Sequence, residues 1–181
     1  MLFIGIESLL YVLIIIYQFN ILKYMSIFFC FLYTIFKKKG YEVLCCVFIA
    51  DYFLLWTQHW LIGIAFFIIV QCYYHHHLSC PIIYYFPLIF CLYPSVYSFA
   101  FCYALLSMIH IIVALYKKDW LVVTLVLLSF CDLCIVFQYL FHTCGEWIWI
   151  FYLPSQVYYV KMVSLHQMKP LKRNCDNQCG Q

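Results

Sequence analysis

Long apolar runs separated by short polar breaks cover most of the chain. A helix needs about 20 mostly apolar residues to cross the hydrocarbon layer of a bilayer. Eight runs approach this length and predict membrane helices: Leu2–Phe19, Leu22–Phe36, Val43–Trp56, Trp60–Tyr74, Ile82–Tyr93, Ser95–Tyr116, Trp120–Phe141 and Trp147–Lys161. The breaks between them hold lysine, histidine, proline and glycine, which end apolar helices. The pattern predicts an all-α, polytopic integral membrane protein with about eight transmembrane helices in one bundle.

Composition agrees with this prediction. Hydrophobic residues make up 68% of the chain and charged residues 9%, whereas soluble domains are roughly half apolar and about a quarter charged. The net charge of +3 is too small for a surface that follows nucleic-acid phosphates. Most of the 12 cysteines lie in apolar runs, where cysteine acts as a small hydrophobe. These values exclude a soluble globular domain, a disordered chain and a nucleic-acid binder.

The positions of the cations predict an orientation. With eight spans, Lys37–Lys39, Lys117–Lys118 and the C-terminal cations fall on the same side as the N-terminus, and Lys23 alone falls on the other. Cytoplasmic loops of membrane proteins carry the excess of lysine and arginine. We therefore expect a multi-pass protein with both termini cytoplasmic. Residues 1–161 form the transmembrane helical bundle, and residues 162–181 form a short basic cytoplasmic tail.

A short internal echo accompanies the eight runs. Asp51 precedes Gln71–Cys72–Tyr73–Tyr74, and Asp132 precedes Gln156–Val157–Tyr158–Tyr159. In both cases the aspartate lies in an odd-numbered span and the Gln-x-Tyr-Tyr motif lies in the next span. The echo is compatible with two four-helix halves in the same orientation, a parallel repeat. Chance is the alternative in a chain so rich in tyrosine and phenylalanine.

Asp51 and Asp132 lie where lipid is expected. A carboxylate at mid-membrane costs several kcal/mol and usually faces a partner or a cavity. Both residues fall roughly 13–20 Å from the start of spans that run in the same direction, so we expect them to meet at one depth. In a poorly solvated pocket, one acid of such a pair stays protonated and donates while the other accepts. Alternatively, each aspartate caps a backbone break or bonds a neighbouring helix.

Other polar residues give weaker signals. We expect Glu7, early in the first span, to extend toward the membrane surface. His110 is expected to have a hydrogen-bonded packing role. His75–His77 is interpreted as an interfacial cluster, because three adjacent helical residues cannot all reach one ion. Cys175 and Cys179 lack the second pair that a zinc site needs. The sequence therefore predicts no metal and no cofactor.

A family resemblance appears in the residues around these acids. Ala50–Asp51–Tyr52–Phe53–Leu54, followed by Gly63, Phe67 and Tyr74, resembles the signature of the YhhN/lysoplasmalogenase family of membrane proteins. Further residues that match the family pattern are Lys23, Tyr103, Met108, Asp132, Tyr152 and Gln156. The likeness runs from about Lys23 to Gln156. It departs at Gln71, where the family has histidine, at Cys131, where it usually has serine, and after Lys23, where proline is customary.

The resemblance implies an integral membrane hydrolase. Such an enzyme cleaves the vinyl ether bond of a lysophospholipid, which releases a fatty aldehyde and a glycerophospho-headgroup. It implies Asp51 and Asp132 as the catalytic acid and base. The implied substrate-binding residues are Lys23, Gln71, Tyr74, Tyr103 and Gln156. The implied partners are the lysophospholipid substrate and membrane lipid.

Three other functions remain open from the sequence. Intramembrane aspartyl proteases also use two helix-borne aspartates, but they share a Gly-x-Gly-Asp motif, and here Ser129–Phe130–Cys131 precedes Asp132. A proton-coupled membrane carrier would use the acids as a relay and fits the internal echo. In a non-catalytic membrane subunit, the acids would bond to neighbouring helices and no cavity would reach them.

Overall fold

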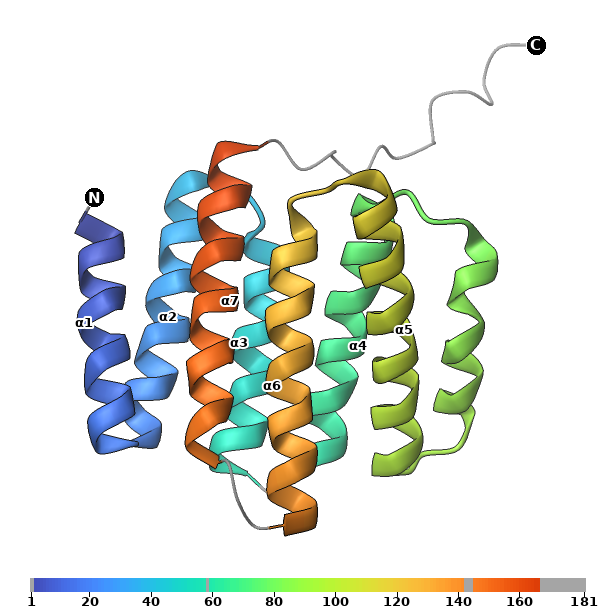
Figure 1. Ribbon diagram of the computed structural model, residues 1–181, viewed down its shortest axis with the longest axis horizontal. Coiled ribbons are helices and arrows are strands. Elements are labelled where there is room, and N and C mark those ends of the chain that lie inside the picture. The colour runs from blue at the N-terminus through green and yellow to red at the C-terminus, as the bar shows by residue number, and fades with distance from the viewer. Residues whose placement is uncertain (1, 58, 142–144, 167–181) are drawn as a thin grey trace.

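The computed structural model describes residues 2–57, 59–141 and 145–166, which form eight helices and no strand (Figure 1). The helices are α1 (Leu2–Tyr17), α2 (Asn20–Lys37), α3 (Tyr41–Trp56), α4 (Trp60–His77), η1 (Ile82–Leu92), α5 (Val96–Lys117), α6 (Leu121–Phe141) and α7 (Gly145–Leu165). Every predicted segment is helical, which confirms the all-α prediction. α7 extends past the predicted boundary at Lys161, and most of the predicted tail lies outside the described residues.

The helices stand side by side and alternate in direction (Figure 1). The start of α1, the α2–α3 turn, the α5–α6 turn and the end of α7 therefore lie at one end of the bundle. We name this end the lysine-rich end, because its turns hold Lys37–Lys39 and Lys117–Lys118. Lys23, in the first turn of α2, lies toward the opposite end.

The two lysine turns share one backbone conformation. Lys38 ends α2 with a φ of 53°, and Lys118 ends α5 with a φ of 51°, both in the left-handed region. Gly40 then begins α3 with a φ of 65°. A Cβ atom at Gly40 would lie 2.6 Å from Cγ1 of Val163, so this turn needs glycine for its backbone and for its close approach to α7.

The helix neighbours repeat along the chain. α1 packs on α2, α2 on α3, α3 on α4, and α2 on α7; likewise η1 packs on α5, α5 on α6, α6 on α7, and α5 on α4. The first four helices therefore correspond in order to the last four: α1 to η1, α2 to α5, α3 to α6 and α4 to α7. Exchanging each helix for its counterpart converts one set of neighbours into the other. The contact between α1 and α7 has no counterpart in the described ranges. This arrangement agrees with two four-helix halves in the same orientation.

α3 and α4 approach each other closely beside the first acid. A Cβ atom at Gly63 would lie 2.8 Å from the Leu54 side chain and 3.3 Å from the Ala50 carbonyl oxygen. A larger residue would push α4 away from α3. Gly63 therefore sets the helix spacing at the level of Asp51, the residue after Ala50.

η1 is a 3₁₀ helix, although its segment was predicted only as a short membrane helix. Pro81 precedes it and Pro87 lies inside it, and an internal proline disfavours α-helical hydrogen bonding. At about 2.0 Å rise per residue, its 11 residues extend about 22 Å. The tighter coil lets a short segment cover much of the height of α5, on which it packs (Figure 1).

Two helices among the described residues are long and apolar enough to cross a membrane. They are Val96–Lys117 and the Leu121–Gln138 part of α6, with mean hydropathies of 2.1 and 2.4. α1 and η1 are also apolar but shorter. Length and composition therefore support membrane association in a general way.

Candidate functional site

Asp51 lies inside the bundle on α3. Its side chain is 4% exposed, and the phenol of Tyr152 on α7 donates a hydrogen bond of 2.6 Å to its Oδ2. Tyr152 is itself 5% exposed. This bond links the first half of the chain to the second.

Asp132 lies on α6 and is only half-buried. The phenol of Tyr103 on α5 lies within hydrogen-bonding reach of its carboxyl group. The second acid therefore bonds within its own half of the molecule, and it keeps some access from outside.

The two carboxyl groups lie at similar depth but do not bond each other. Each aspartate is about 15–17 Å from the lysine-rich start of its helix. In the described part of the chain, the backbones of α3 and α6 do not approach each other closely. Cys131 lies within electrostatic range of both carboxyl groups, and Tyr152 lies within range of Cys131 and Tyr103.

We name these five residues the carboxylate–tyrosine layer: Asp51, Tyr152, Cys131, Tyr103 and Asp132. Each acid bonds a neighbouring helix, which was the alternative expectation for a lone aspartate. Even so, the layer keeps two carboxyl groups and two phenols together in a buried or half-buried site. Such groups can hold a proton, pass it on, and stabilise a nearby positive charge.

Lys23 approaches this layer from the end opposite the lysine-rich end. Its side chain is 8% exposed, and its Nζ lies 4.9 Å from the Trp149 ring centroid. The Trp149 ring in turn contacts Tyr152 edge-on, with centroids 5.3 Å apart. A buried ammonium on an aromatic face is a cation–π contact, and here it connects a predicted substrate-binding residue to the partner of Asp51.

Gln71 belongs to a different cluster, nearer the lysine-rich end. Its Oε1 lies 2.7 Å from Nδ1 of His110, and Nε2 of His110 lies 3.2 Å from Nδ1 of His75. We name Gln71, His110 and His75 the histidine layer. His110 is thus buried and hydrogen-bonded inside the bundle.

Tyr74 and Gln156 carry buried polar atoms that lack partners. Tyr74 Oη and Gln156 Oε1 have no hydrogen-bond partner among the described residues. The Gln156 amide nitrogen makes only a bond of 3.4 Å to Ser155 Oγ. Buried polar atoms are normally paired, so these two are exceptions to the general rule.

Glu7 is the polar residue for which the sequence-based expectation was wrong. Its side chain is 3% exposed and does not extend to the surface. Ser26 Oγ donates to it at 2.5 Å, and Cys30 Sγ lies 3.8 Å away. Ser26 and Cys30 lie one turn apart on α2, so they present two donors to α1. That spacing was the available signal, but it has meaning only once the two helices are known to pack together.

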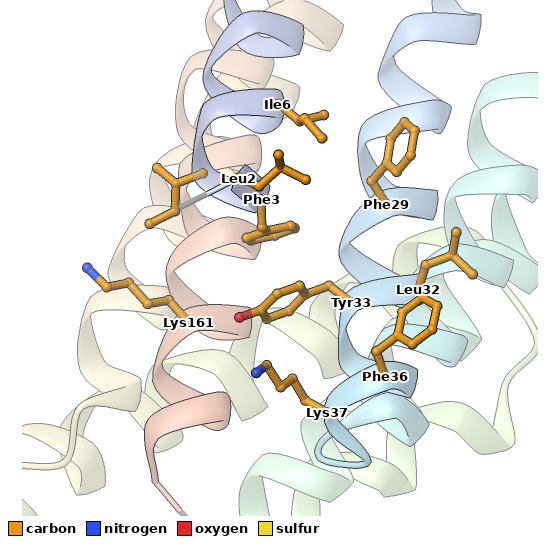
Figure 2. Close-up of a pocket in the computed structure, with 10 residues that line it drawn as sticks. Leu2, Phe3, Ile6, Phe29, Leu32, Tyr33, Phe36, Lys37 and Lys161 are labelled. Atoms are coloured by element: carbon orange, nitrogen blue, oxygen red, sulfur yellow. The ribbon is translucent and has the colours of Figure 1, made fainter.

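One groove lies away from both layers. It has a volume of about 530 Å³ and runs between α1 and α2 (Figure 2). Leu2, Phe3 and Ile6 line one wall, and Tyr33 lies at one end with Lys37 and Lys161. The groove contains none of the predicted catalytic or substrate-binding residues.

No protein-family model matches the sequence, and no curated protein and no solved structure matches it either.

Proposed function

We propose that this chain is a membrane-embedded lysoplasmalogenase-like hydrolase that uses Asp51 and Asp132 as an intramembrane acid/base pair. The observation that supports the proposal most directly is the carboxylate–tyrosine layer. Two acids at similar depth, each held by a phenol, suit a reaction that begins with proton delivery. The resemblance of the surrounding residues to the YhhN/lysoplasmalogenase pattern supplies the substrate class.

The distribution of side chains supports the membrane part of the proposal. Large apolar side chains are exposed on the outside of the bundle, among them Leu2, Ile16, Ile82, Ile112 and Val136. Soluble monomers rarely expose apolar patches of more than a few hundred Å². Polar side chains such as Glu7, Lys23, Asp51, Gln71 and His110 are buried instead. We propose eight spans, with the lysine-rich end and both termini on the cytoplasmic side.

The chemistry of vinyl ethers suits this layer. A proton from a carboxylic acid adds to the alkene carbon that is not bonded to oxygen, which leaves an oxocarbenium ion. The second carboxylate stabilises this cation and takes a proton from the water that attacks it. The resulting hemiacetal collapses to a fatty aldehyde and frees the glycerol hydroxyl. One water is consumed, and no redox step is needed.

The two acids differ in exposure, and we assign their catalytic roles on this basis. Asp132 is half-buried, so we assign it the proton delivery to the substrate. Asp51 is more enclosed and bonded to Tyr152, so we assign it to the cation and the attacking water. The single alkenyl chain would lie between apolar helices. The unpaired atoms of Tyr74 and Gln156 would receive hydroxyl or headgroup oxygens.

The first test is aldehyde release by the purified protein from a panel of lysophospholipids with vinyl ether, alkyl ether or ester links. We expect release from the vinyl ether lipids alone. D51N and D132N should each reduce the rate at least about 100-fold, because general acid–base groups contribute about 10²–10⁴-fold.

D119N is the matched control. Asp119 Oδ1 accepts a hydrogen bond of 2.9 Å from the Leu121 backbone N–H at the start of α6. Asparagine caps a helix equally well, so the rate of D119N should be unchanged. Full activity in D51N or D132N would remove the acid-pair mechanism. Lack of aldehyde from every vinyl ether lipid would remove the substrate class.

A proton-coupled carrier is the second candidate. The repeated helix neighbours favour it, because carriers are often built from repeats with the binding site near the bilayer midplane. Reconstituted vesicles distinguish the two functions. A carrier would move protons across the membrane without releasing aldehyde, whereas a hydrolase would release aldehyde without moving protons.

A further inference from the structure

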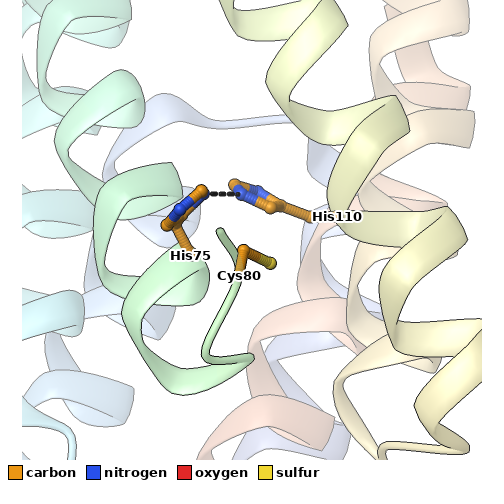
Figure 3. Close-up of side chains that lie close together, drawn as sticks. All are labelled: His75, Cys80 and His110. Carbon is orange, nitrogen blue, oxygen red and sulfur yellow. Dashed lines mark hydrogen bonds between the residues drawn. The ribbon is translucent and has the colours of Figure 1, made fainter. Parts of the chain in front are cut away.

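His75, Cys80 and His110 converge near the lysine-rich end of the bundle (Figure 3). Their ligand atoms all lie within 4.8 Å of one another. His75 is at the end of α4, Cys80 is in the linker to η1, and His110 is on α5. Both histidines are buried and Cys80 is partly buried. The three residues thus come from three separate segments.

We propose that these residues form a zinc-binding site. Zn²⁺ binds imidazole nitrogen at about 2.0–2.1 Å with tetrahedral geometry, which places two such nitrogens about 3.3 Å apart. The distance between His75 Nδ1 and His110 Nε2 is 3.2 Å. Cys80 supplies a thiolate, the ligand type that favours zinc over magnesium or calcium. The fourth position is left for water or another oxygen ligand.

The surroundings of both imidazoles suit metal ligands. Gln71 Oε1 lies 2.7 Å from His110 Nδ1, so His110 donates there and directs its Nε2 lone pair toward His75. His75 Nε2 lacks a hydrogen bond of normal geometry among the described residues, while the carbonyl groups of Cys80 and Pro81 approach its ring. Metal-bound histidines typically give their second N–H to such oxygens.

The site would fix the linker that leads into η1. Lys117 Nζ already bonds the carbonyl oxygens of Leu78 and Ser79, just before Cys80. After Cys80, the Tyr85 ring of η1 stacks on His75 with centroids 3.7 Å apart. A zinc ion would tie α4, the linker and α5 together, and it would hold η1, whose backbone approaches that of α5 alone among the described helices.

The test is metal binding by the full-length protein in detergent, in a C175S/C179S background that removes the tail thiols. After chelator treatment, dialysis against ZnCl₂ should leave one zinc per chain by atomic emission. Co²⁺ should give the visible spectrum of a tetrahedral site with a thiolate-to-metal charge-transfer band. Binding should release the thiol proton, so affinity should rise with pH.

Variants decide whether these residues carry the metal. C80S should abolish the charge-transfer band and weaken zinc binding at least about 100-fold. H110Q should weaken zinc binding to the same extent. H76Q and C45S should bind as the parent does, because His76 is exposed beside the site and Cys45 is on α3. Circular dichroism and gel filtration check folding. Zinc retained in C80S, or no zinc in the parent, would overturn the proposal.

Discussion

The two halves of the molecule use the same pattern of residues in different surroundings. Asp51 and Asp132 each precede a Gln-x-Tyr-Tyr motif, and Tyr74 and Tyr159 from the two motifs contact each other with ring centroids 5.8 Å apart. Yet Asp51 bonds Tyr152 from the other half. Tyr152 lies four residues before Gln156. The residue four before Gln71 is Phe67, which has no hydroxyl. Asp132 bonds Tyr103 instead.

The two glutamines differ for a similar reason. Gln71 bonds His110 on α5. On α2, the counterpart of α5, the residue equivalent to His110 is Cys30. Each lies at the same distance before the lysine that caps its helix. The Cys30 thiol faces Glu7. Gln156 Oε1 is therefore left without a partner among the described residues. The comparison teaches that a repeated backbone does not repeat its chemistry, because single substitutions redirect the hydrogen bonds.

The largest difference between the halves should appear when the phenols are removed. Y152F leaves the enclosed Asp51 without a donor and should lower the free energy of unfolding by about 1.5 kcal/mol. Y103F should cost about 0.5 kcal/mol, because its contact with the half-buried Asp132 is looser than the bond of 2.6 Å at Asp51. SDS titration followed by circular dichroism measures both. Equal losses would mean that the two acids have equivalent environments.

A smaller difference is expected between the glutamines. Q71L leaves His110 Nδ1 without an acceptor and should cost about 1 kcal/mol of unfolding free energy. Q156L removes an amide oxygen that is already unpaired, so the folded protein should be as stable as the parent. The same unfolding titration tests the pair. A clear loss in Q156L would show that Gln156 has a structural partner.

The smallest effect concerns Phe67. Its ring centroid lies 6.1 Å from that of Tyr103, so F67Y offers Asp132 a phenol from the first half, at the position equivalent to Tyr152. F67Y in the Y103F background should recover about half of the stability lost in Y103F. F67L in the same background is the control and should recover none. No recovery in F67Y would show that the two halves differ in register as well as in residue type.

The helical segments and their polar residues could be predicted from the sequence. Apolar run length located all eight helices, because a break such as Lys37–Lys39 is costly to keep inside an apolar helix. Helix rise alone predicted the similar depth of Asp51 and Asp132, which follows from their positions in helices that run the same way.

The partners of these residues could not be predicted. Helix rise gives depth but not the rotation of one helix against another, so Tyr152 on α7 was matched to the family pattern without being identified as the partner of Asp51. Glu7 shows the same limit: its burial depends on Ser26 and Cys30 facing α1. Cys80 joins two histidines only because the chain turns back after α4.

The sequence by itself determined an all-helical chain, with an apolar exterior and a few acids set deep within its helices. Helix formation and hydrophobic length are local properties, and a linear pattern records them. Only the tertiary structure decided which polar groups meet: two acids held by separate tyrosines, and two histidines drawn together with a cysteine. Those meetings depend on the packing angles and close approaches of helices, which arise from many weak contacts distributed along the whole chain.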